Sequence, residues 1–121
     1  MLEVKNLAVH YGAIKAIRDI SFSVEKGEVI TLIGSNGAGK TSTLHALSNI
    51  LKKHSGTVLF NGTDITNMLP NEIVRSGLIQ SPEGRRVFAD LSVRDNLEMG
   101  AYTRKDRAGI ARDMERVFSL F

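Results

Sequence analysis

Eight consecutive residues combine glycines, a lysine and a hydroxyl group at a spacing that suits anion binding. They match the pattern G-x-x-x-x-G-K-[ST] and are Gly34, Ser35, Asn36, Gly37, Ala38, Gly39, Lys40 and Thr41. A glycine-rich bend lets successive backbone N–H groups converge on one anion, because glycine reaches conformations that a Cβ forbids. Lys40 adds a positive charge and Thr41 a hydroxyl. The pattern is typical of the Walker A loop, which holds the phosphates of a nucleoside triphosphate.

The residues on either side of this loop favour the same interpretation. An apolar run, Val29 to Ile33, precedes the loop, and a helical pattern opens at Lys40. The start of a helix offers unpaired N–H groups and a positive dipole end to the anion. We expect Lys40 to reach the β- and γ-phosphates and Thr41 to ligate a Mg²⁺ that bridges them. Ser42 is either a further contact to the α-phosphate or a solvated first-turn serine.

Hydrolysis needs groups that this loop does not contain. Phosphoryl transfer also uses an acid after a second apolar strand, which holds Mg²⁺, and a residue that polarises the attacking water. After the loop, no run of four apolar residues leads into an acid; Val87 to Asp90 comes nearest, but it follows two arginines and is typical of a turn. We therefore assign no catalytic residue and expect weak nucleotide binding with little or no hydrolysis by these 121 residues.

The composition is that of a soluble globular domain, or part of one: 42% of the 121 residues are apolar and 24% are charged. The net charge is +3, but from residue 83 onward eight basic residues are interleaved with seven acidic ones, so a nucleic-acid groove is not indicated. The absence of cysteine excludes disulfides and thiolate metal sites and suits a reducing compartment. No run approaches the roughly 18 apolar residues of a membrane span, so we expect no direct membrane insertion.

Alternation of apolar residues and turn signals predict two hairpins. The first has strands over residues 2–9 and 13–24, with a turn at Tyr11-Gly12. The second begins with a strand over Thr57 to Phe60, and Asn61-Gly62 provides its turn. Both hairpins are antiparallel, and together they predict an accessory sheet.

Other segments predict the core that this sheet accompanies. Glu28 to Ile33 is predicted to be a buried strand, and Lys40 to Leu51 a helix. A short helix over Pro70 to Arg75 is expected to lead into a strand over Leu78 to Gln80. This order of strand, loop and helix predicts an α/β fold, a P-loop NTPase core with an antiparallel accessory sheet.

The character of the chain changes after Pro82. Ser92 and Asp95 fit an N-cap and capping-box position, so a helix is expected to start near Val93. The last segment carries one apolar stripe, formed by Ile110, Met114, Val117, Phe118 and Phe121. We therefore divide the chain into residues 1–82 and residues 83–121, the latter a loop and the start of an incomplete helical subdomain. The final helix has no stop signal, and we expect the chain to be the front part of a longer domain.

The order of these features closely resembles the ATP-binding subunits of ABC transporters. The resemblance rests on Tyr11 and on the stretches GSNGAGKTS, SGTVLFNGTDIT and SPEGRRVFADLSVRDNLEMG. It covers essentially the whole chain, which is similar to the first half of such a subunit. The PEGRRVF stretch is most like the second ATPase subunit of branched-chain amino acid importers, and urea-type importers share much of the pattern.

The resemblance implies roles for two further residues. Tyr11 stands where the family has an aromatic that stacks on adenine; otherwise it is a turn-flanking tyrosine that packs on the sheet. No guanine-reading N-K-x-D loop occurs, which favours ATP over GTP. Glu83 stands at the place of a lid-loop glutamine that contacts Mg²⁺ and senses the γ-phosphate, whereas Gln80 lies three residues early. Arg85 and Arg86 either face the transmembrane partner or are ordinary exposed arginines.

Other polar residues are interpreted as structural. His10, His45 and His54 lack partners at metal-ligand spacing. Asp64 recurs in the family pattern but fits a turn or cap residue better than a metal ligand.

The resemblance also implies partners and a location. The complete subunit would be an ATPase that forms a head-to-tail dimer with a second ATP-binding subunit. It would bind transmembrane permease subunits on the cytoplasmic face of the inner membrane and couple ATP hydrolysis to amino acid import. The family's LSGGQ signature, second acidic strand, catalytic glutamate and switch histidine do not occur in these residues. The alternatives are a non-catalytic nucleotide-binding fragment or regulatory module, the ATPase of a urea or amide importer, and a P-loop kinase.

Overall fold

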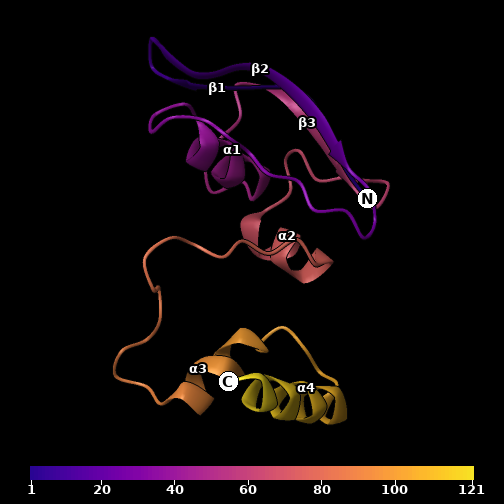
Figure 1. The fold of residues 1–121 in the computed structure, drawn as a ribbon. Coiled ribbons are helices and arrows are strands. Elements are labelled where there is room, and N and C mark those ends of the chain that lie inside the picture. The colour runs from indigo at the N-terminus through magenta and orange to yellow at the C-terminus, as the bar shows by residue number, and fades with distance from the viewer. The chain divides into compact units, whose positions relative to one another are not determined.

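The computed structural model describes residues 1–121 and divides them into two compact units, Met1–Gln80 and Ser81–Phe121 (Figure 1). The first unit contains a mixed arrangement of strands and helices, and the second contains helices alone. The predicted α/β class is confirmed. The interpretation of the two units as subdomains of a larger domain stays a prediction.

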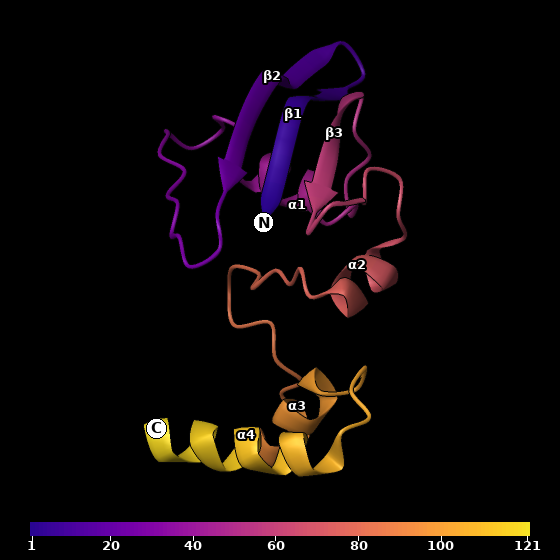
Figure 2. The ribbon, with the colours of Figure 1, turned by 90° about the vertical axis from the view of Figure 1, so that its right-hand side faces the viewer.

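The sheet of the first unit has four antiparallel strands in the order β2-β1-β3-β4. Figure 2 shows the first three of these side by side. They are β1 (Leu2–Tyr11), β2 (Ile14–Val24), β3 (Ser55–Phe60) and β4 (Thr63–Asp64). Both predicted hairpins are confirmed. Asn61 and Gly62 between β3 and β4 have φ of 49° and 79°. A two-residue type I′ hairpin turn requires positive φ at both of these positions.

The strands β1 and β3 approach each other closely at a bulge in β1. Asn6 has φ of 53° there, and its backbone N–H donates to Ser21 Oγ at 2.8 Å. On the facing strand Gly56 has φ of 102°, and a Cβ at this position would lie 2.6 Å from the Asn6 carbonyl oxygen. Position 56 therefore requires glycine for its conformation and for its space.

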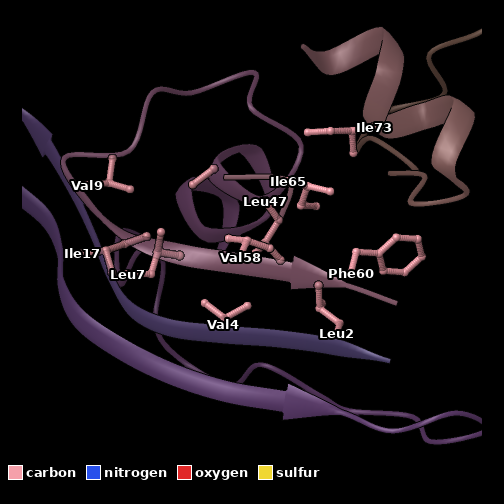
Figure 3. Packing of buried hydrophobic residues seen from close by; sticks show 11 residues of the cluster. Leu2, Val4, Leu7, Val9, Ile17, Leu47, Val58, Phe60, Ile65 and Ile73 are labelled. Atoms are coloured by element: carbon pink, nitrogen blue, oxygen red, sulfur yellow. The ribbon is translucent and has the colours of Figure 1, made fainter. Parts of the chain in front are cut away.

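One face of the sheet forms the core together with α1 (Lys40–Leu47) and α2 (Pro70–Ser76), as Figure 3 shows. Alternating residues of β1 and β3 point inward because successive side chains of a strand point to opposite faces. The largest fully buried side chains are those of Val4, Leu7, Val9, Val58, Ile65 and Ile73. Ala46 and Leu47 are the α1 residues in this core, so the second half of the helix packs against the sheet.

Two predicted strands are wrong. Glu28 to Ile33 forms no strand, and the Val29 and Ile33 side chains are 93% and 92% exposed. Leu78 to Gln80 also forms no strand, and Ile79 is 73% exposed. A strand needs a neighbour that pairs with its backbone N–H and C=O groups, and neither segment pairs with β1 to β4. Local apolar character alone did not produce the pairing.

The helix α1 ends at Leu47, four residues before its predicted end at Leu51. Asn49 takes a left-handed conformation with φ of 54°, which stops the helix. Its side-chain amide donates to three carbonyls of the segment that follows β4, those of Ile65, Thr66 and Met68. Lys53 Nζ donates to the Ala46 carbonyl at 2.9 Å and also to Asn49 Oδ1. Hydrogen bonds from Asn49 to the segment after β4 therefore determine where α1 ends.

The second unit contains α3 (Val93–Gly100) and α4 (Arg107–Leu120). The predicted N-cap is confirmed, because Ser92 Oγ accepts from the Asp95 N–H at 3.1 Å. Arg104 donates to the Asp106 and Asp113 carboxylates, with 2.6 Å in each ion pair. The apolar stripe of α4 is at most half-buried, and Gly109 is the buried residue of that helix. None of the helices combines the length and apolar character that crossing a membrane demands.

Candidate functional site

The predicted phosphate-binding loop lies directly before α1 and curls back on itself. Gly37 and Gly39 have φ of 85° and 94°, in the left-handed region that favours glycine. The Ala38 N–H donates to the Ser35 carbonyl at 3.1 Å, which closes a turn. Lys40 Nζ donates to the carbonyl oxygen of Gly34 at the start of the loop. The lysine side chain therefore spans the bend that its own segment forms.

The loop contacts the sheet at Gly39, which caps the N-terminus of α1. A Cβ on Gly39 would lie 2.9 Å from the Ala16 carbonyl oxygen and 3.2 Å from Ile17 Cγ1 on β2. By contrast, a Cβ on Gly37 would meet no atom within 4 Å. Thr43, which is buried, donates its hydroxyl hydrogen to the Gly39 carbonyl at 2.8 Å. The base of the loop is thus fixed, while open space lies beside Gly37.

A pocket of about 410 Å³ lies between the loop and the β1–β2 hairpin. The hairpin supplies Tyr11, Ile14, Lys15 and Ala16; the loop and helix supply Asn36, Gly37, Gly39, Lys40, Thr41 and Ser42. The structure therefore brings the predicted Tyr11 together with the predicted loop. Gly34, Ser35 and Ala38 shape the bend without lining the pocket. A larger groove of about 1050 Å³ lies in the second unit and contains none of the residues predicted to bind nucleotide or metal.

The chemistry of this pocket suits an anion at one end and a flat apolar group at the other. Lys15 and Lys40 line it without any carboxylate, and the first turn of α1 has no acidic residue. The first N–H groups of the helix have no partner within it, and the helix dipole adds positive potential. Tyr11, with its side chain about half exposed, and Ile14 offer aromatic and apolar surface. These residues fit a nucleoside triphosphate.

Sequence reasoning missed three of the lining residues, Ile14, Lys15 and Ala16. They belong to β2, and their sequence pattern indicates only a strand. Their short separation from Tyr11 in the sequence could have indicated them, because a tight turn after Tyr11 must bring the next strand back beside it. The structure also places the Tyr11 phenol oxygen 3.1 Å from Ser42 Oγ, a hydrogen bond that the sequence did not predict.

Glu83 belongs to the second unit and is exposed. It precedes a turn in which Gly84 and Arg85 have φ of 80° and 41°, and the Glu83 carbonyl accepts from Arg86 Nε at 3.2 Å. Its assignment as a Mg²⁺ ligand and sensor stays a prediction. Gln80, in the first unit, accepts from Ser48 Oγ at 3.2 Å.

Three of the remaining polar residues, His10, His54 and Asp64, have structural partners. The His10 and His54 rings stack with their centroids 3.7 Å apart. Partial burial lowers the pKa of His10, and the positive charges of His54 and Lys15 lower it further. Asp64 Oδ1 accepts from the Thr66 N–H at 2.9 Å, which confirms its turn role. Hydrogen bonds from the Thr66 side chain and N–H lower the pKa of Asp64.

Comparison with known proteins agrees with this geometry. The ABC transporter family model matches residues 17–120. The chain is 39% identical, over its whole length and 52% of the relative, to the high-affinity branched-chain amino acid transport ATP-binding protein BraG of Pseudomonas aeruginosa. It is 34% identical, over 88% of this chain and 48% of the relative, to the lipopolysaccharide export system ATP-binding protein LptB of Escherichia coli.

A solved structure establishes the likeness of fold. It is the dimeric post-hydrolysis state of an ATP-binding cassette bound to ADP and Pi. The match has a TM-score of 0.76 at 18% identity and covers 88% of this chain and 49% of that chain. The chain thus spans about half the length of the relatives it matches. Because the family model matches most of the chain, this protein belongs to the ABC transporter family.

Proposed function

We propose that the pocket between Tyr11 and the loop of residues 34–42 binds ATP with Mg²⁺. The observation that carries the proposal is the convergence of an aromatic ring, a glycine bend and two lysines on one pocket without a carboxylate. An isolated glycine bend would suit any small anion. The adjoining aromatic and apolar surface of Tyr11 and Ile14 adds a place for a base.

Each part of the pocket has a proposed role. The loop N–H groups and the start of α1 hold the β-phosphate, and Lys40 exchanges its bond to the Gly34 carbonyl for the β- and γ-phosphates. Thr41 lines the pocket and supplies a hydroxyl oxygen to Mg²⁺. Tyr11 stacks on the base, and Ser42 contacts the α-phosphate. Glu83 is a second proposed Mg²⁺ ligand, because a carboxylate oxygen suits this hard cation. Bound Mg²⁺ would neutralise phosphate charge.

For the complete subunit we propose ATP hydrolysis coupled to transport. The name of BraG supports branched-chain amino acids as the transported class, and import as the direction. The name of LptB describes export of lipopolysaccharide at nearly the same identity, so the cassette sequence carries less information on the cargo than on the nucleotide. The dimeric cassette supports a dimer of ATP-binding subunits. We further propose permease partners on the cytoplasmic face of the inner membrane.

Calorimetric titration of the chain with Mg-ATP tests the nucleotide site. We expect Lys40→Ala to weaken binding at least about tenfold, because it removes the positive charge that faces the terminal phosphates. Lys52→Ala is the matched control, since it removes the same charge from an exposed position outside the pocket. Equal affinity of the Lys40→Ala variant and the unaltered chain would contradict the assignment. Phosphate release by the 121 residues is expected to be little or none.

A further inference from the structure

We propose that the phenol of Tyr11 and the hydroxyl of Ser42 form a hydrogen-bond relay that ends on the α-phosphate. The relay would make Tyr11 a positioning residue for phosphate binding in addition to a surface for the base. This inference rests on the proposed function, because it concerns the same pocket.

The geometry joins two elements that are distant in the sequence. Tyr11 is the last residue of β1, and Ser42 is the third residue of α1. Their oxygen atoms lie 3.1 Å apart, and both residues line the pocket. The bond therefore connects the polar end of the aromatic ring to the helix whose N-terminus faces the proposed phosphates.

The bond is unusual for a hydroxyl group within a helix of this protein. Thr43, Ser76 and Ser119 each donate to a carbonyl three or four residues back in the chain. Such back-bonding is the ordinary choice of a helical serine or threonine. Ser42 instead pairs with a residue 31 positions away. Its hydroxyl is thereby held in the pocket.

The chemistry of hydroxyl groups gives this pair a direction. A serine hydroxyl has one hydrogen to donate and can accept two hydrogen bonds. When Tyr11 donates to Ser42 Oγ, the serine hydrogen is free to point at a phosphate oxygen. When Ser42 donates to Tyr11, that hydrogen is consumed. A bound anion therefore selects the first arrangement, and the tyrosine polarises the serine as a donor.

A ligand that lacks a nucleobase distinguishes the effect of the relay from the effect of stacking on Tyr11. Binding of Mg-tripolyphosphate should be about three times weaker for Tyr11→Phe, which keeps the ring and removes only the hydroxyl, as expected for the loss of one modest hydrogen bond. Ser42→Ala should weaken binding by at least as much. Adding Tyr11→Phe to Ser42→Ala should change nothing further, because the serine that connects the phenol to the phosphate is gone.

Two comparisons distinguish the possible failures. Tyr102→Phe is the matched control, since this exposed tyrosine belongs to the second unit, and it should bind tripolyphosphate as the unaltered chain does. If Tyr11→Phe also binds tripolyphosphate unchanged while Lys40→Ala loses it, the relay is wrong and the nucleotide site stands. Additive effects of the two hydroxyl deletions would overturn the relay in the same way. If Lys40→Ala binds both ligands unchanged, the phosphate site itself is wrong.

Discussion

The two units of the chain bury their apolar residues to very different degrees. In the first unit Leu7, Val9, Val58 and Ile73 are fully buried. In the second, no residue of α3 is buried and the stripe of α4 remains partly exposed. Both units nevertheless contain regular elements with the expected local signals: the Asn61-Gly62 turn follows β3, and Ser92 caps α3. The difference teaches that local signals suffice to form a helix or hairpin, whereas a core requires segments distant in the chain to meet.

The largest predicted effect compares the two units directly. Leu7→Ala removes a fully buried side chain and should lower the free energy of unfolding by about 4 kcal/mol. Ile110→Ala truncates a half-buried residue of α4 and should cost about 1 kcal/mol. Denaturant unfolding followed by circular dichroism measures both. Similar losses for the two variants would break the contrast between the units.

A second pair of substitutions sharpens the comparison within the first unit. Gly56→Ala should cost about 3 kcal/mol, because the new methyl group meets the β1 backbone at a position with positive φ. Gly62→Ala is the matched control: its φ of 79° is also positive, but nothing lies within 4 Å of the added atom. It should cost about 1 kcal/mol from backbone strain alone. Thermal unfolding measures the stability of both variants. If both lose the same stability, the close approach of β1 and β3 at Gly56 does not add to the cost of the Gly56→Ala substitution.

The smallest predicted effect is a difference between the two units in the pH range over which each loses folding stability. His10 has a pKa below its ordinary 6.5, so the unfolded chain binds more protons and stability falls as the pH drops through that value. His10→Gln should flatten this loss. In the second unit, hydrogen bonds from Arg104 lower the pKa of Asp106 below its ordinary value of 3.8. The ionised carboxylate therefore stabilises the folded state above pH 3.8, and this stabilisation is lost as the pH falls below that value. Unfolding midpoints across pH, with Asp106→Asn beside His10→Gln, check both windows. A single shared window would contradict the assignment.

Those features that depend on neighbouring residues could be predicted from the sequence. Asn61-Gly62 determines its hairpin turn, Ser92 caps α3, and the spacing of glycines before Lys40 indicates the loop. Each involves only a few adjacent residues, whose conformational preferences act without the rest of the fold.

Features that depend on distant segments could not be predicted. Glu28 to Ile33 has the apolar character of a strand, but pairing depends on which other strand lies beside it. The end of α1 is determined by Asn49, whose side chain bonds to carbonyls 16 to 19 residues away. The Tyr11–Ser42 bond likewise appears only when the hairpin is placed over the helix. Non-local contacts leave no pattern in a window of adjacent residues.

The unpaired residues 29–33 affect the solubility of this polypeptide. Val29, Ile30, Thr31, Leu32 and Ile33 form an uncharged, β-prone stretch with exposed side chains and no proline. Such a stretch is a ready nucleus for cross-β aggregation. At high concentration the polypeptide should therefore aggregate. The substitution Val29→Lys should keep it in solution, because the added charge repels neighbouring copies.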